Sequence, residues 1–185
     1  MITSLVLSDA FLLCVCFYIL LTSPQSVTFK FGVSLVSVAS FLGVLKFSEI
    51  LPLPSLHAFF SSLSASSAIL MIMVGIIWRS RLVAVSSRYA WILFMVSAEL
   101  TFIMSSAFGL NYFGYMMAGT STVGIICHQA ILKNKDGLIG GVLLLVGFLA
   151  FLTKIELFSV LEPGDYLHFF MAVGIYKLSR STVLV

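Results

Sequence analysis

The chain has 185 residues, of which 61% are hydrophobic and only 9% are charged, with a formal net charge of +3. Soluble domains are closer to half apolar and a quarter charged, so this composition excludes an ordinary soluble globular protein. The small positive charge is explained by basic residues between the apolar runs, which suit anionic lipid headgroups, and no nucleic-acid partner is expected. We expect one all-α integral membrane domain over residues 1–185, in contact with the lipid bilayer.

Apolar runs separated by turn residues predict seven membrane-spanning helices. In chain order they are expected at residues 4–22, 31–46, 55–77, 88–107, 112–132, 137–153 and 164–180. The turns "TSPQS", "LPLPS", "NKDG" and "EPGD" combine Pro or Gly with residues that cap helices. The first run lacks the basic segment of a signal peptide, so cleavage is not expected.

The basic residues predict how the seven helices are oriented. If successive loops alternate across the membrane, one side receives only Lys46 and Lys154. The other side receives Lys30, Arg79, Arg81, Arg88, Lys133, Lys135, Lys177 and Arg180. Because basic residues are retained on the cytoplasmic side, the N-terminus is expected outside and the C-terminus inside. The expected location of this multi-pass protein is a bacterial inner membrane.

Four ionisable residues inside the predicted spans are the main functional signal. At 1.5 Å per residue, Asp9 lies about 9 Å into the first span, and His57 and His168 lie about 5 Å into the third and seventh. Glu99 lies about 16 Å from the inner end of the fourth. Such groups cost at least about 2.5–3.5 kcal/mol at mid-depth, so they are expected to face the bundle interior. Asp9 could bond a neighbouring serine, and Glu99 could be protonated or paired with a histidine.

Two more polar residues share a helix face with the histidines. Ser61 follows His57 by one turn, and Asp165 precedes His168 by three residues. Neutral histidine and ionised carboxylate are good zinc ligands, so this cluster of acids and histidines could hold a metal ion. A bound zinc could activate water, as in a hydrolase within the membrane.

The same residues also have a structural interpretation. Asp165 follows Pro163 and Gly164, so it is well placed to cap the seventh helix, with His168 reaching back in the manner of a capping box. Ser55 is expected to cap the third helix, which would leave His57 as an interfacial residue. Both interpretations remain open from the sequence.

The seven spans and three short motifs together resemble the CREST superfamily, which includes alkaline ceramidases and adiponectin-type receptors. The motifs are "LSDAFLLCV", "SLHAFFSSLSASS" and "GDYLHFFMAVGIY", and the chain is most similar to a small, uncharacterised bacterial branch. The resemblance implies a zinc held by three histidines, two of them spaced HxxxH in the last helix, assisted by a serine and an aspartate. Here Ala172 stands four residues after His168, and Asp165 is the candidate substitute ligand. On this resemblance the candidate metal ligands are His57, Asp165 and His168, and the candidate catalytic residues, which would position water, are Asp9 and Ser61.

Two functions follow from these observations. The missing histidine favours a non-catalytic or degenerate subunit or scaffold of a membrane assembly, with integral membrane partners. The alternative is a membrane-embedded, metal-dependent hydrolase of a lipid amide or ester, with zinc as cofactor. Transport by way of Glu99 and Asp9 ranks third, because the sequence shows no convincing inverted repeat.

Overall fold

The computed structural model describes residues 3–51, 53–80, 86–110, 112–154 and 161–181, and within these ranges the chain is helical with no strand. The helices are α1 (Ser4–Thr22), α2 (Val27–Phe47), α3 (Pro54–Leu63), α4 (Ile69–Ser80), α5 (Ser87–Ser106), α6 (Phe113–Ile131), α7 (Lys135–Leu152) and α8 (Pro163–Arg180). A π-helical segment, η1 (Ser64–Ala68), joins α3 and α4 into one continuous helix. The described residues therefore form seven helical segments, and the predicted all-α class is confirmed.

The predicted boundaries agree with the helices to within a few residues, and the largest error is at the start of α2. This helix begins at Val27, because the Ser26 side chain caps it by accepting a hydrogen bond from the Phe29 amide at 3.2 Å. The predicted start at residue 31 left Lys30 outside the helix, but the lysine lies inside the first turn. Ser55 was wrongly expected to cap α3, which begins one residue earlier at Pro54, with Leu53 as its N-cap.

Five of the described helical segments are long and apolar enough to cross a membrane. They are Ser4–Thr22, Val27–Phe47, Pro54–Arg79, Ser87–Ser106 and Lys135–Leu152. α6 and α8 are of similar length but contain more polar side chains, among them Gln129 in α6 and Asp165 in α8. The five long apolar segments are compatible with a membrane protein.

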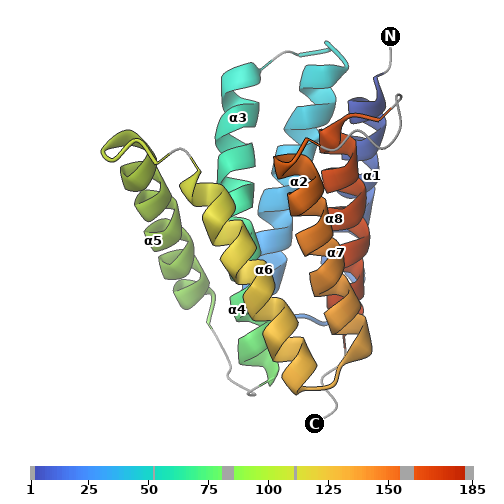
Figure 1. Cartoon of the computed structure of the whole chain (residues 1–185), viewed down its shortest axis with the longest axis vertical. Coiled ribbons are helices and arrows are strands. Elements are labelled where there is room, and N and C mark those ends of the chain that lie inside the picture. The colour runs from blue at the N-terminus through green and yellow to red at the C-terminus, as the bar shows by residue number, and fades with distance from the viewer. Residues whose placement is uncertain (1–2, 52, 81–85, 111, 155–160, 182–185) are drawn as a thin grey trace.

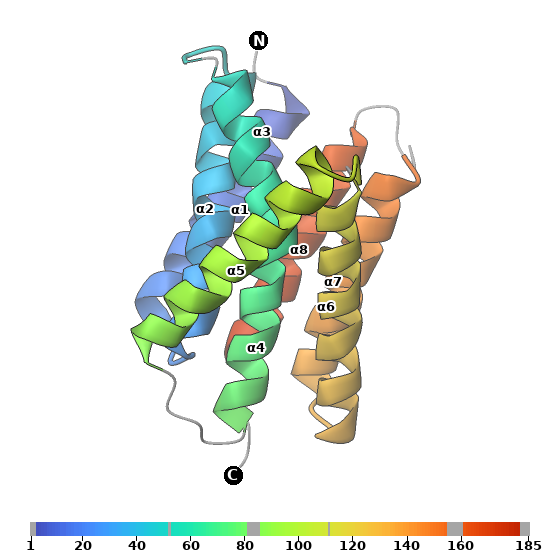
Figure 2. The ribbon, with the colours of Figure 1, turned by 90° about the vertical axis from the view of Figure 1, so that its left-hand side faces the viewer.

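Successive helical segments run in alternating directions, which places the N-terminus and the C-terminus at opposite ends of the bundle (Figure 1). α8 packs against both α7 and α1, and α1 packs against α2, so the last helix lies beside the first. α5 stands apart at the edge and crosses the bundle obliquely in the perpendicular view (Figure 2). The core is built from apolar residues of α1, α2, α4, α7 and α8, with smaller contributions from α5 and α6.

Glycines allow α7 and α8 to approach closely. A Cβ atom added at Gly140 would lie 2.8 Å from the Gly174 carbonyl oxygen, and one added at Gly174 would lie 2.9 Å from the Gly140 carbonyl oxygen. Gly137 and Gly141 also lie in a helix contact, against the side chains of α6. Small residues at such contacts permit the backbone approach that stabilises helix pairs in lipid.

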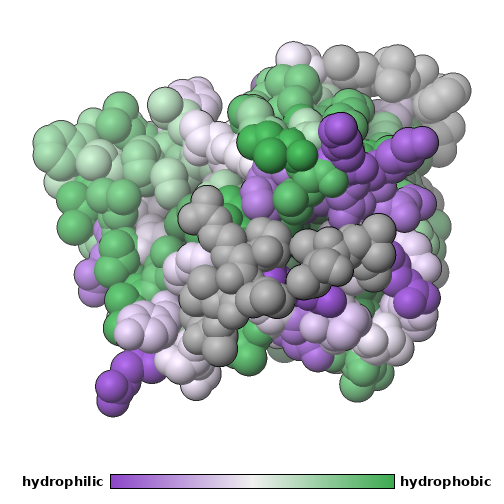
Figure 3. Space-filling model, turned by 90° about the horizontal axis from the view of Figure 1, so that it is seen from below, coloured by the Kyte–Doolittle hydropathy of each residue, from purple (hydrophilic) through white to green (hydrophobic). Residues whose placement is uncertain are grey.

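Charged side chains gather at the end of the bundle where the C-terminus lies. In the view from that end, hydrophilic residues lie mainly in the right half of the picture, while the left side, which α5 occupies, is mainly hydrophobic (Figure 3). Lys177 of α8 pairs there with Asp136 of α7 at 2.8 Å. Arg81 lies outside the described residues. The other seven basic residues that were assigned to the inner side belong to the helix ends and turns of this end.

Candidate functional site

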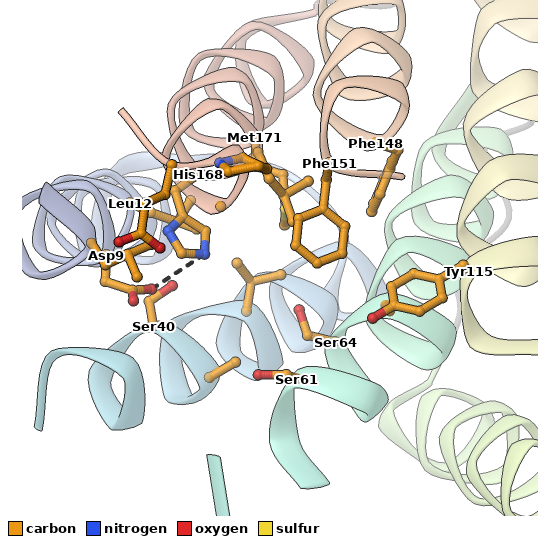
Figure 4. A pocket seen from close by; sticks show the side chains of 18 of the residues that line it. Asp9, Leu12, Ser40, Ser61, Ser64, Tyr115, Phe148, Phe151, His168 and Met171 are labelled. Carbon is orange, nitrogen blue, oxygen red and sulfur yellow. Dashed lines mark ion pairs between the residues drawn. The ribbon is translucent and has the colours of Figure 1, made fainter. Parts of the chain in front are cut away.

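A cavity of about 740 Å³ lies between the helices and reaches the end of the bundle that holds the N-terminus. Its walls come from α1, α2, α3, η1, α7 and α8, with two tyrosines at the start of α6 (Figure 4). Most of the lining is apolar, and the ionisable residues in it are Asp9, His57, Lys154, Glu162 and His168. The volume is within the usual range for sites that bind small molecules.

Four polar side chains join α1 to α8 on one side of this cavity. The Ser8 hydroxyl donates to Asp165 Oδ1 at 2.6 Å and lies 3.1 Å from His168 Nδ1. On the other edge of the imidazole, Nε2 lies 3.5 Å from Asp9 Oδ1. Ser8, Asp9 and Asp165 are buried, and His168 is mostly buried. This α1–α8 network is therefore shielded from solvent, and only its Asp9 and His168 members line the cavity.

The hydrogen-bond chemistry of the network fixes where its protons must lie. Because Ser8 gives its single proton to Asp165, its oxygen is left to accept the Nδ1 proton of His168. His168 Nε2 and Asp9 then face one another and must share one further proton, either as an imidazolium beside a carboxylate or as a neutral pair. Asp9 Oδ2 packs against Gly43 of α2 and has no hydrogen-bond partner among the described residues.

Asp165 serves as a structural residue in this arrangement. Its Oδ2 accepts a hydrogen bond from the Glu162 backbone amide at 2.8 Å, as in a capping box, while Oδ1 accepts from Ser8. The capping interpretation of Asp165 is confirmed, although its capping partner is Glu162 and not His168. Both carboxylate oxygens are occupied, and Asp165 does not line the cavity.

His57 lies in a separate polar group on the α3 side of the cavity. Its Nε2 is 3.4 Å from the Ser61 hydroxyl, and its Nδ1 is 3.5 Å from Lys46 Nζ. An ammonium can only donate, so Nδ1 must be the acceptor and Nε2 must carry the proton. A general base for a serine needs the opposite tautomer, with a carboxylate at Nδ1. Ser61 is consequently not activated as a nucleophile by this contact.

The three candidate metal ligands are not assembled into one site. No group of three or more His, Cys, Asp or Glu side chains in the described part of the chain could hold a metal ion. His57 is engaged with Lys46 and Ser61, and Asp165 is engaged with Ser8 and Glu162. Ala172, where the resemblance implies a histidine, is completely buried and supplies no ligand. These residues do not fit the zinc centre that the resemblance implies, and zinc binding stays a prediction.

Measuring bound metal tests this point directly. We expect the protein, purified without chelators, to hold less than about a tenth of an equivalent of zinc, because zinc sites need at least three ligands. The His57→Ala and His168→Ala variants should give the same low value by elemental mass spectrometry. One equivalent of zinc in the wild type that is lost in both variants would show that the ligands come together after all.

The structure corrects the expectation for Glu99 and adds two residues that the sequence did not indicate. Glu99 was expected to face the bundle interior, but its side chain is exposed on α5, outside the cavity. Ser8 and Lys46 contact the predicted residues directly. For Ser8 the sequence contained no signal except its position next to Asp9. Lys46 was considered only as one of the basic residues between the predicted spans.

No family model, curated protein or solved structure matches the chain in the comparisons made. The resemblance to the CREST superfamily therefore stays a prediction, and the site is interpreted from its own geometry.

Proposed function

We propose that this chain is a multi-pass integral membrane protein that binds an amphiphilic molecule in its cavity without hydrolysing it. We place it in the membrane with seven spans, the N-terminus outside and the C-terminus inside, which the charge difference between the two ends supports. A bacterial inner membrane is the location that we propose.

The mostly apolar lining of the cavity, with its ionisable residues near the mouth, carries this proposal. On α1 and α8, Asp9 and His168 are each followed one turn deeper by apolar lining residues, Leu12 and Met171. On α7, which runs in the opposite direction, Lys154 lies at the mouth and Phe148 lies deeper. A mostly apolar cavity whose ionisable side chains lie near its mouth suits a molecule with one polar head and a hydrocarbon tail. A lipid or a lipid-derived amide has this form.

The surroundings of Ser61 and Ser8 in the described structure support binding over hydrolysis. The Nε2 atom of His57 carries a proton and cannot accept one from Ser61. Ser8 is buried and does not line the cavity. The non-catalytic part of the proposal agrees with the preferred sequence-based hypothesis, a subunit or scaffold. Ligand binding is added because a purely structural bundle has no need of a cavity of this size with ionisable side chains near its mouth.

The alternative of a lipid amide or ester hydrolase is favoured by one observation, the 3.4 Å contact between Ser61 and His57 at the cavity wall. The two functions differ in a measurable product. A purified protein that releases fatty acid from an N-acyl amide, and loses this activity in both Ser61→Ala and His57→Ala, would establish the alternative.

Filling the cavity tests the binding proposal. We expect Leu12→Trp to weaken binding of a dansyl-labelled dodecylamide at least about tenfold, because the indole occupies the space for the tail, and tenfold corresponds to about 1.4 kcal/mol. The matched control is Leu21→Trp, on the same helix but exposed to lipid, which should bind as the wild type does. Dansyl fluorescence in nanodiscs gives both affinities. Equal affinities for the two variants would place the probe outside the cavity.

A further inference from the structure

Glu99 is the most unusual charged residue outside the cavity. It lies twelve residues after the first residue of α5 and seven before the last, which places it about 18 Å and about 10 Å from the two ends. α5 is long and apolar enough to cross a membrane, and the Glu99 side chain is exposed. In a membrane, a carboxylate at this depth on the outer surface of the bundle would face the hydrocarbon tails of the lipids. Ionisable groups inside a membrane are normally paired with another group.

The surroundings of Glu99 offer no partner among the residues that the structure describes. Its helical neighbours three and four residues away on either side are all exposed and apolar: Met95, Val96, Phe102 and Ile103. The described residues supply neither a hydrogen bond nor an ion pair to Glu99. The carboxylate is therefore the centre of an apolar stripe, here called the α5 outer face, which consists of Met95, Val96, Glu99, Phe102 and Ile103.

The attachment of α5 to the bundle is consistent with a face that serves another molecule. Only 17% of the α5 span is buried within the chain, against 56% for α2. The side that packs inward carries small residues, Ala90, Ser97 and Thr101. Trp91 and Phe94 contact Phe31 of α2, whereas Glu99 and the exposed apolar residues beside it are directed away from the bundle. α5 stands at the edge of the bundle in Figure 1 and crosses in front of it in Figure 2.

We propose that the α5 outer face binds a transmembrane helix of a different protein, and that this helix carries a lysine or arginine at the depth of Glu99. Charge complementarity identifies the partner, because a basic side chain within hydrogen-bond reach neutralises the carboxylate where water is absent. A second copy of this chain would instead bring Glu99 towards an equal charge. The basic residues that the structure describes lie near helix ends or in turns, so a second copy has none at this depth to offer.

Model transmembrane helices test the proposal with the full chain. The probes are a polyleucine helix with one central lysine and an all-leucine helix of the same length, each labelled for energy transfer to the protein in nanodiscs. We expect the lysine helix to bind the wild type at least about tenfold more tightly than the all-leucine helix. Glu99→Leu should bind both equally, and Glu99→Lys should prefer a helix with a central glutamate. Equal binding of the two probes to the wild type would overturn the proposal.

Two further measurements separate the α5 outer face from charge attraction alone and from self-association. Val96→Ala combined with Ile103→Ala should weaken binding of the lysine helix at least about threefold, while Val142→Ala combined with Val146→Ala, on the exposed side of α7, should not. Equal binding by both double variants would mean that the face contributes nothing. Energy transfer between two labelled copies of the wild type that disappears in Glu99→Leu would identify a homodimer and overturn the proposal of a different partner.

Discussion

Replacing Asp165 with alanine is expected to lower the free energy of unfolding by about 2–4 kcal/mol, one of the two largest effects that we predict for a single substitution. The carboxylate is completely buried and accepts two hydrogen bonds, one from the Ser8 hydroxyl and one from the Glu162 amide. Hydrogen bonds to charged groups contribute about 1.5–3 kcal/mol each, and the donors left behind keep their desolvation cost. Asp165→Asn should fall between the wild type and Asp165→Ala, since its amide retains only one acceptor oxygen.

The matched control for this prediction is Asp136→Ala. Asp136 pairs with Lys177 on the exposed surface at the opposite end of the bundle, where solvent screens the interaction, so little loss of stability is expected. Unfolding in mixed detergent and dodecyl sulfate micelles measures both variants. A double-mutant cycle with Ser8→Ala should give a coupling energy of about 1–2 kcal/mol. Additive effects of Ser8→Ala and Asp165→Ala would show that the bond between them contributes nothing.

Gly140→Leu is expected to lower the free energy of unfolding by about 2–3 kcal/mol, because the new side chain must enter a contact between two backbones. The nearest atoms to its Cβ would be the Gly174 carbonyl oxygen and Leu178, both in the core of the α7–α8 pair. A flexible side chain could move aside, but a helix backbone cannot do so without separating the two helices.

Gly119→Leu in α6 is the control for Gly140→Leu, since nothing lies within 4 Å of a Cβ atom at Gly119. This substitution should leave stability unchanged or raise it slightly, because leucine favours the helix more than glycine does. Thermal unfolding of both variants in the same detergent is the measurement. If Gly119→Leu were as damaging as Gly140→Leu, the loss would come from glycine replacement in general and not from the α7–α8 contact.

Much of the fold follows from the sequence because hydrophobic length is a strong signal. The apolar runs predicted seven helical segments, and the boundaries of α1 and α8 agree to within one residue. The predicted start at residue 31 left Lys30 outside α2, whereas the cap is Ser26 and the lysine lies in the first turn. A single charged residue in the first turn of a helix is compatible with either interpretation, and only the cap geometry decides between them.

The candidate site was predicted less completely, because depth in a helix can be read from a sequence but rotation about the helix axis cannot. Asp9, His57 and His168 were placed correctly near one end, and all three line the cavity. Which side chains face one another depends on which helices are neighbours. Adjacency of α1 and α8 brings Asp9 to His168, while His57 contacts Lys46 of α2. α5 has large apolar residues on most of its circumference, so no hydrophobic pattern indicated that Glu99 points outward.

The contact between α1 and α8 also determines when the bundle can be completed during synthesis. Ser8 and Asp165 are separated by 157 residues, so a ribosome making about 5–20 residues per second delivers the second partner roughly 8–30 s after the first. During this interval Ser8 and Asp9 have neither His168 nor Asp165 as a partner. The contact between α1 and α8 therefore forms only after the other helices have been made.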